Sequence, residues 1–181
     1  EQMDHQAVIA LSHIPDQPGI AARLFETLSG AGINVDLIIQ ATHEGSSNDI
    51  TFTVAEADLE AARSVSQTVL DSLGGELAAE GGMTKLSISG AGIMGRPGIA
   101  AGLFHCLSQQ GINLRLIATS EVKVSCVIDA DSGRKALQAV QQAFVGADAD
   151  VELAPDLLSS NEPEVRGLAL DRVPAQLAVR H

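Results

Sequence analysis

The sequence predicts an α+β protein made of two consecutive βαββαβ units, each an antiparallel four-stranded sheet with both helices on one face. A 23-residue segment occurs twice, at positions 18–40 and 97–119, with 14 identical residues and a constant offset of 79. Apolar residues follow the period of a helix in some stretches and the period of a strand in others. Gly and Pro separate these stretches. Split βαβ units with right-handed crossovers then give the predicted arrangement.

The first copy opens with an apolar run, Ala7–Ser12, which predicts a strand. A turn that contains Pro and Gly follows it. A helix is expected from Ile20, because Ile20, Leu24 and Leu28 are spaced four apart and form one apolar stripe. Gly32 is expected to end this helix, where a residue with positive φ is commonly needed.

The remainder of the first copy predicts two strands, a helix and a closing strand. The second strand starts at Ile33; its even-numbered positions 34–40 are expected to share one face, and its odd-numbered positions 35–39 to face the core. Apolar and polar residues alternate again along Ile50–Val54. An apolar stripe between Leu59 and Leu73 predicts the second helix. A short strand is expected near Glu76–Ala79.

The second copy repeats the same order of elements. Its expected segments are a strand at Leu86–Ser89, a helix that follows Gly98 and ends at Gly111, a strand from Ile112, an alternating strand at Val122–Ile128, a helix whose stripe runs from Ala136 to Phe144, and a strand at Asp150–Leu153.

The pattern divides the chain into a first module at 1–81, a second at 82–154 and a linker at 155–164. Residues 165–181 predict the start of a further module, because Ala175–His181 resembles the opening strand of the first copy and ends on a His in the same place. The chain is therefore expected to be a fragment of a longer protein. A C-terminal hairpin is the alternative for this segment.

Composition excludes several classes of function. The net charge is −12, and the 11 Lys and Arg are scattered, which argues against nucleic acid and against an anionic membrane surface. No run of 18 apolar residues predicts a membrane span. Cys106 and Cys126 lack the spacing of a zinc site or of a disulfide framework. We therefore expect no metal and no cofactor, and two free thiols in a reducing cytoplasm.

The turn Asp16–Gly19 carries the first candidate binding site. It leads into the N-terminus of the helix from Ile20, where unpaired N–H groups suit a carboxylate. Asp16, Asp36 and Gln40 supply acceptors for an ammonium group, and Asn34 is expected on the same strand face. An amino acid carries both of these groups. The alternatives are that Asp16 only shapes the turn and that Asp36 is a solvated strand charge.

These motifs resemble those of ACT domains, the amino-acid-sensing modules of metabolic enzymes, which have a ferredoxin-like fold. The segments His13–Gly19, Ile33–Gln40 and Asp49–Thr53 are similar to the first ACT module of aspartate kinases. Gly90–Met94 and Leu116–Ser125 resemble the second. The resemblance covers nearly the whole chain. Its most specific part is the Thr-Ser-Glu segment that precedes a strand.

The resemblance implies a regulatory role in feedback control of the aspartate pathway, with lysine, threonine or both as effector. The kinase domain of that family is separate and N-terminal, and its Lys-Phe-Gly-Gly motif is absent from this sequence, so the chain is expected to be non-catalytic. Homodimerisation through the ACT modules is expected. Gly167–Asp171 resembles the leader of another ACT pair, which implies a cyanobacterial-type form with more than two ACT modules.

The family's effector-binding role is carried over to matching positions only. In the first module these are Asp16, Gly19, Ile20, Ala21 and Gln40, and in the second Thr119, Ser120 and Glu121, which are expected to reach the site across a module interface.

Three alternatives remain open. Tandem ACT modules also serve as regulatory subunits of other amino-acid metabolic enzymes. A catalytic enzyme of the same topology would use Cys106 or Cys126 as nucleophile, although no base is visibly paired with either. An RNA-binding module would need stacking aromatics on its strands and basic charge, and the chain lacks such a set of aromatics and has a net charge of −12. The segment Ser120–Glu121 could also serve only as a turn between strands.

Overall fold

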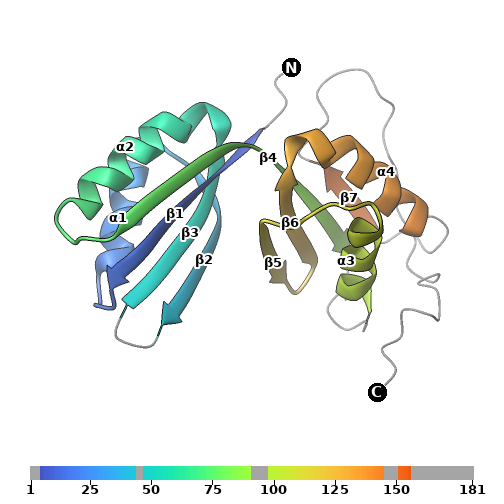
Figure 1. Cartoon of the computed structure of the whole chain (residues 1–181), viewed down its shortest axis with the longest axis horizontal. Coiled ribbons are helices and arrows are strands. Elements are labelled where there is room, and N and C mark those ends of the chain that lie inside the picture. The colour runs from blue at the N-terminus through green and yellow to red at the C-terminus, as the bar shows by residue number, and fades with distance from the viewer. Residues whose placement is uncertain (1–4, 44–46, 91–97, 145–150, 156–181) are drawn as a thin grey trace. The chain divides into compact units, whose positions relative to one another are not determined.

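In the computed structural model (Figure 1) the chain divides by its internal contacts into two compact units. One unit is Asp4–Met83, and the other begins at Thr84. Each has its own hydrophobic core. The residues that the structure describes are 5–43, 47–90, 98–144 and 151–155.

The first unit has the predicted order of elements, with one short 3-10 helix added before the second α-helix. Its strands hydrogen-bond in the order β2-β3-β1-β4, and the pairs are antiparallel. This is the strand order of a ferredoxin-like βαββαβ unit. The elements are β1 Gln6–Pro15, α1 Ile20–Gly30, β2 Val35–His43, β3 Ser47–Ala55, η1 Glu56–Asp58, α2 Leu59–Leu70 and the first part of β4 Glu76–Gly90.

Both helices of this unit cover the same face of its sheet. The core joins Leu24 and Leu28 of α1 to Ile9 of β1 and Phe52 of β3, all of them fully buried. Phe25 of α1 meets Phe52 edge to face, with ring centroids 5.5 Å apart. Each fully buried Leu contributes about 1.5–3 kcal/mol through apolar burial. The predicted stripe of α1 is thus the face that holds this helix on the sheet.

The C-terminus of α1 ends in a Schellman motif. Gly32 has φ +76°, as expected, and its N–H donates to Ser29 O at 2.9 Å. The N–H of Ile33 donates to Leu28 O at 3.0 Å. Because the cap uses the Ile33 N–H, this residue cannot join the strand ladder, and β2 begins at Val35 instead of at the predicted Ile33.

The same cap recurs in the second unit. The N–H of Gly111 donates to Ser108 O at 2.9 Å, and that of Ile112 donates to Leu107 O at 3.0 Å. The following strand, β5, begins at Leu116 and not at the predicted Ile112.

The pairing of β2 with β3 contains a bulge that the sequence pattern did not reveal. The register shifts between Val35 and Ile38, so two residues of β2 lie opposite Thr53 alone. Within the bulge the N–H of Leu37 donates to Thr53 Oγ1 at 3.0 Å. A strict two-residue period along this strand is therefore interrupted near its start.

The bulge corrects the predicted faces of β2. Directly paired residues share a face of the sheet, and Gln40 pairs with the core residue Ile50. Gln40 therefore lies on the helix-covered face. Of the odd-numbered positions 35–39 only Val35 packs against the core, so the prediction was wrong for Leu37 and Ile39. Position 36 lies in the bulge, so the expected common face of positions 34, 36 and 40 is not continuous.

The second helix, α2, buries the stripe that its sequence predicts. Ala62, Val69 and Leu70 are buried, and Leu59, Val65 and Leu73 pack against the core from its margin. Ser66 is fully buried in the same stripe without a hydrogen-bond partner for its hydroxyl among the described residues.

The second unit repeats the topology, with strands in the order β7-β4-β6-β5. Leu86 and Ile88 of β4 join Leu103 and Leu107 of α3 in a core that also includes Val140 of α4. The predicted strands near Glu76–Ala79 and at Leu86–Ser89 are both part of the single strand β4. The further elements are α3 Ile99–Gln109, β5 Leu116–Ser120, β6 Lys123–Asp129, η3 Ala130–Ser132, α4 Gly133–Phe144 and β7 Val151–Pro155.

The strand β6 departs from the predicted half-buried alternation. Val122 lies in the turn before it and is 54% exposed, because the strand starts only at Lys123. Ser125 and Val127, predicted for the polar face, are buried as well. The hydroxyl of Ser125 lies 2.8 Å from the Ser87 hydroxyl, which satisfies both groups.

The predicted linker and further module fall mostly outside the described residues. Pro155 ends β7, and residues 156–181 are not described.

Candidate functional site

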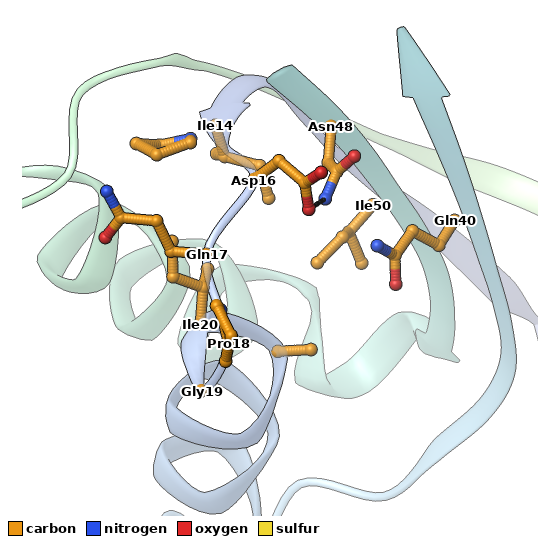
Figure 2. A pocket seen from close by; sticks show the side chains of 11 residues that line it. Ile14, Asp16, Gln17, Pro18, Gly19, Ile20, Gln40, Asn48 and Ile50 are labelled. Atoms are coloured by element: carbon orange, nitrogen blue, oxygen red, sulfur yellow. Dashed lines mark hydrogen bonds between the residues drawn. The ribbon is translucent and has the colours of Figure 1, made fainter. Parts of the chain in front are cut away.

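A cavity of about 300 Å³ opens in the first unit where β1 ends and α1 begins (Figure 2). This volume is at the lower end of the range for small-molecule sites. Its lining comes from the end of β1, the following turn, the first residues of α1, and facing positions on β2 and β3. The lining residues are Ile14, Pro15, Asp16, Gln17, Pro18, Gly19, Ile20, Ala21, Gln40, Asn48 and Ile50.

The N-terminus of α1 gives one side of the cavity positive character. Gly19 is the N-cap residue with φ +94°, and no side chain of the described residues caps the helix. The N–H of Ile20 donates to Gln17 O at 3.4 Å. The other N–H groups of the first turn have no acceptor within the helix, and the helix dipole adds partial positive charge there. Ile20 and Ala21 stand at this end. A carboxylate is the group that such a helix end accommodates.

Asp16 provides the negative charge of the cavity. It is exposed, and its Oδ1 accepts a hydrogen bond from Asn48 Nδ2 at 2.8 Å. Figure 2 shows the amide nitrogen of Asn48 directed at this carboxylate. Acceptors of this kind bind an ammonium group, so the cavity offers complementary charges to the two polar ends of an amino acid.

Gln40 reaches the cavity from β2 because of the bulge. Its pairing with Ile50 sets it on the helix-covered face, and Figure 2 shows its amide beside Ile50. Ile14, Ile20 and Ile50 are all buried and form the apolar wall. An amide at the rim and apolar side chains beneath it are the common composition of small-ligand pockets.

Five of the predicted site residues line this cavity: Asp16, Gly19, Ile20, Ala21 and Gln40. Asn34 and Asp36 do not line it. Thr119, Ser120 and Glu121 lie at the end of β5 and in the turn after it, within the second unit. The binding role of every one of these residues stays a prediction.

Sequence reasoning missed Asn48, which is 5% exposed. A signal was available, because Asn48 precedes Ile50 and Phe52 at intervals of two and so occupies a core-facing position of β3. A polar residue at the end of an apolar strand face calls for a partner. The sequence could not identify that partner, because Asp16 is 32 residues away.

A second polar cluster lies next to the cavity, around Asp49. Its Oδ1 accepts a hydrogen bond from the His13 N–H at 3.0 Å, and its Oδ2 lies 2.8 Å from His43 Nε2. The hydrogen bond with the His43 side chain, followed by that from the His13 backbone, lowers the pKa of Asp49 below 3.8. His13 has φ +57°, in the left-handed region that non-glycine residues rarely adopt.

The two thiols do not have the character of nucleophiles. Burial raises the pKa of Cys126 to about 12 and also raises that of Cys106. A catalytic cysteine needs the opposite shift, because the thiolate is the reactive form. His105, next to Cys106 in sequence, is instead within 2.9 Å of Gln109. The cysteine-enzyme alternative therefore lacks support at both positions.

Within the described part of the chain, no group of three or more His, Cys, Asp or Glu side chains could hold a metal ion. None of the described helices combines the length and apolar character needed to span a membrane.

Comparison with known proteins identifies the class. An ACT domain family model matches residues 10–68 and again 86–144, once in each unit. An aspartokinase of Thermus thermophilus is 42% identical over 144 residues, which are 78% of this chain and 35% of that protein. The chain thus spans about a third of the length of the curated relatives it matches.

Solved structures narrow the class further. The regulatory subunit of aspartate kinase from Thermus thermophilus superposes with a TM-score of 0.73 at 40% identity, covering 78% of this chain and 93% of that one. The aspartate kinase of Synechocystis gives a TM-score of 0.73 at 44% identity, covering 77% of this chain and 25% of that one. The chain belongs to the ACT domain family, as a tandem pair of the regulatory type found in aspartate kinases.

Proposed function

We propose that the chain senses lysine, threonine or both, and thereby mediates feedback control of an aspartate kinase. The observation that carries this proposal is the cavity in the first unit. It combines a helix N-terminus, the Asp16 carboxylate and the Gln40 amide around an apolar wall. These are the complementary groups for the carboxylate, the ammonium and the side chain of a small amino acid.

In the proposed complex the ligand carboxylate meets the first-turn N–H groups of α1, and Gly19 lets it approach the backbone closely. The ammonium group lies toward Asp16 and the Gln40 amide oxygen. Thr119, Ser120 and Glu121 contribute from a second ACT module, either of this chain or of its partner in a homodimer. Asn34 and Asp36 act only at the margin, because neither lines the cavity.

Regulation then follows from differential affinity. An effector shifts an equilibrium only by binding one arrangement of the modules better than the other. We propose that the attached kinase domain, carried by the longer protein in the cytoplasm, responds to that shift. Support comes from the relatives: the matched region covers 35% of the aspartokinase of Thermus thermophilus and 93% of the regulatory subunit of aspartate kinase from the same organism. A form with more than two ACT modules stays a prediction from the sequence, since the Synechocystis match shows only that this chain covers 25% of that kinase.

The test is isothermal titration calorimetry of the chain with L-lysine and L-threonine, separately and together, with the mass in solution recorded. Asp16→Asn is expected to weaken binding about ten- to a hundredfold, because a hydrogen bond to a charged group contributes about 1.5–3 kcal/mol. Glu60→Gln is the matched control, since it removes one exposed carboxylate of α2 in the same unit.

Saturable binding that Asp16→Asn weakens and Glu60→Gln leaves unchanged supports the proposal and names the effector. Binding of neither amino acid by a folded dimer refutes the lysine and threonine assignment and favours a tandem-ACT regulatory subunit of another amino-acid metabolic enzyme. A panel of the remaining amino acids in the same assay identifies the ligand of that subunit.

A further inference from the structure

The Asn48 side chain is buried in the wall of the cavity and bonds to an exposed carboxylate. Asn48 is 5% exposed, and its Nδ2 donates to Asp16 Oδ1 at 2.8 Å. Asp16 is exposed, so water can reach its carboxylate even without an amide partner. The hydrogen bond therefore does not serve to satisfy the carboxylate. It does fix the direction in which the carboxylate points (Figure 2).

The other end of the amide is unsatisfied. Asn48 Oδ1 is buried and has no hydrogen-bond partner among the described residues. Such a buried acceptor lowers the stability of the fold, and an apolar residue at this core-facing position would avoid the loss. An unsatisfied buried group in a native structure needs an explanation other than stability. Among the described residues, the hydrogen bond that this amide forms is the one to Asp16, so the reason for an Asn at this position is to be sought there.

The orientation of the amide is also determined. If Asn48 were turned over, its oxygen would face the Asp16 carboxylate, and two acceptors would meet. Only Nδ2 can therefore contact Asp16. The contact occupies Asp16 Oδ1, while Oδ2 forms no hydrogen bond to the described residues and stays available to a ligand.

We propose that Asn48 is a positioning residue: it holds the Asp16 carboxylate in the orientation that receives the ammonium group of a bound amino acid. The inference rests on the proposed function of the cavity. It adds a residue from β3 whose effect on affinity is exerted through Asp16 and not through a contact of its own.

The test is a double-mutant cycle on affinity, measured by calorimetry with L-lysine and L-threonine as probes. Asn48→Ala in the otherwise unchanged chain is expected to weaken binding roughly tenfold, as expected for loss of one hydrogen bond to a charged group. In an Asp16→Ala background the same change is expected to have almost no effect. A residue that only supports the fold would weaken binding equally in both backgrounds.

Three further variants keep the test independent of folding. Asn48→Thr places a hydroxyl donor on the same strand and is expected to restore part of the affinity, while Asn48→Val, of similar shape without a donor, is not. Ser47→Ala changes the neighbouring residue of β3, which does not line the cavity, and is expected to bind like the unchanged chain.

The outcomes separate the two proposals. Binding by the unchanged chain with additive losses in the cycle, or equal affinity of the Thr and Val variants, overturns the role of Asn48 alone. No binding of either probe by the unchanged, folded chain overturns the lysine and threonine assignment and this inference together. A non-additive cycle with recovery in Asn48→Thr establishes the positioning role.

Discussion

The loop between α2 and β4 contains two adjacent glycines whose surroundings differ. Gly74 has φ +78°, and a Cβ added there would meet no atom of the described residues within 4 Å. Gly75 has φ +110°, and its Cβ would stand 2.7 Å from the Ser12 carbonyl oxygen. It would also stand 3.2 Å from Ile14 Cγ2 and 3.2 Å from Leu70 Cδ2. A substitution by Ala therefore causes only backbone strain at Gly74, whereas at Gly75 it causes backbone strain and steric overlap with neighbouring atoms.

The magnitudes follow from these distances. Gly74→Ala is expected to lower the free energy of unfolding by about 1–2 kcal/mol, the penalty of a left-handed conformation for a residue with a Cβ. Gly75→Ala adds overlap with a backbone atom of β1, which cannot move without disturbing its pairing with β4. With about 1–3 kcal/mol of backbone strain and about 1–3 kcal/mol of overpacking, a loss of about 4 kcal/mol is expected.

The assay is urea denaturation followed by far-ultraviolet circular dichroism, because the chain contains no Trp or Tyr. Gly74→Asn is the control, since Asn tolerates the left-handed region better than Ala and is expected to lose less stability. If Gly75→Ala is no less stable than Gly74→Ala, the close packing of this loop against the end of β1 is refuted. Ile14 lines the cavity, so Gly75→Ala is also expected to weaken ligand binding.

Three further predictions concern the cavity, a carboxylate and a thiol. Gly19→Ala is expected to lose about 1–2 kcal/mol of stability from its left-handed φ of +94°, with a smaller loss for Gly19→Asn, as measured by urea denaturation. Because the pKa of Asp49 is lowered in the folded state, the ionised carboxylate stabilises the fold above pH 3.8, and this stabilisation is lost as the pH falls through the folded-state pKa. The difference in free energy of unfolding between the unchanged chain and Asp49→Asn is therefore expected to disappear at acid pH. Cys126, with a pKa of about 12 and a fully buried side chain, is expected to react with a thiol reagent only after denaturant unfolds the chain, whereas labelling in native buffer would contradict its burial.

Most of the fold could be predicted from the sequence because each element carries its own local signal. The stripe of Ile20, Leu24 and Leu28 needs only the helical period, and Gly32 and Gly111 mark helix ends whose positive φ the structure confirms. The internal repeat then fixes the order of elements twice. These signals are local, so no knowledge of the tertiary arrangement was needed to read them.

The bulge in β2 and the partner of Asn48 could not be predicted in the same way. A bulge adds one residue to a strand pair, and nothing in the composition of Val35–Ile38 distinguishes it from regular strand. The face of Gln40 depends on that extra residue. The bond between Asn48 and Asp16 depends on the register of β1 against β3. Alternating hydrophobicity shows which face of each strand is buried, but not which residue of β1 lies opposite which residue of β3.

A second irregularity, at the end of β1, shows how that register serves the cavity. The pairing of β1 with β3 shifts by one residue between Leu11 and Ile14, where His13 takes its left-handed conformation. The His13 N–H donates to Asp49 Oδ1, which holds the extra residue in place. Without the shift, Asn48 would lie opposite His13, and Ile14 would lie on the other face of the sheet. The extra residue therefore buries Ile14 in the core and sets Asn48 where it reaches Asp16, so the strain at His13 is part of how the cavity is built.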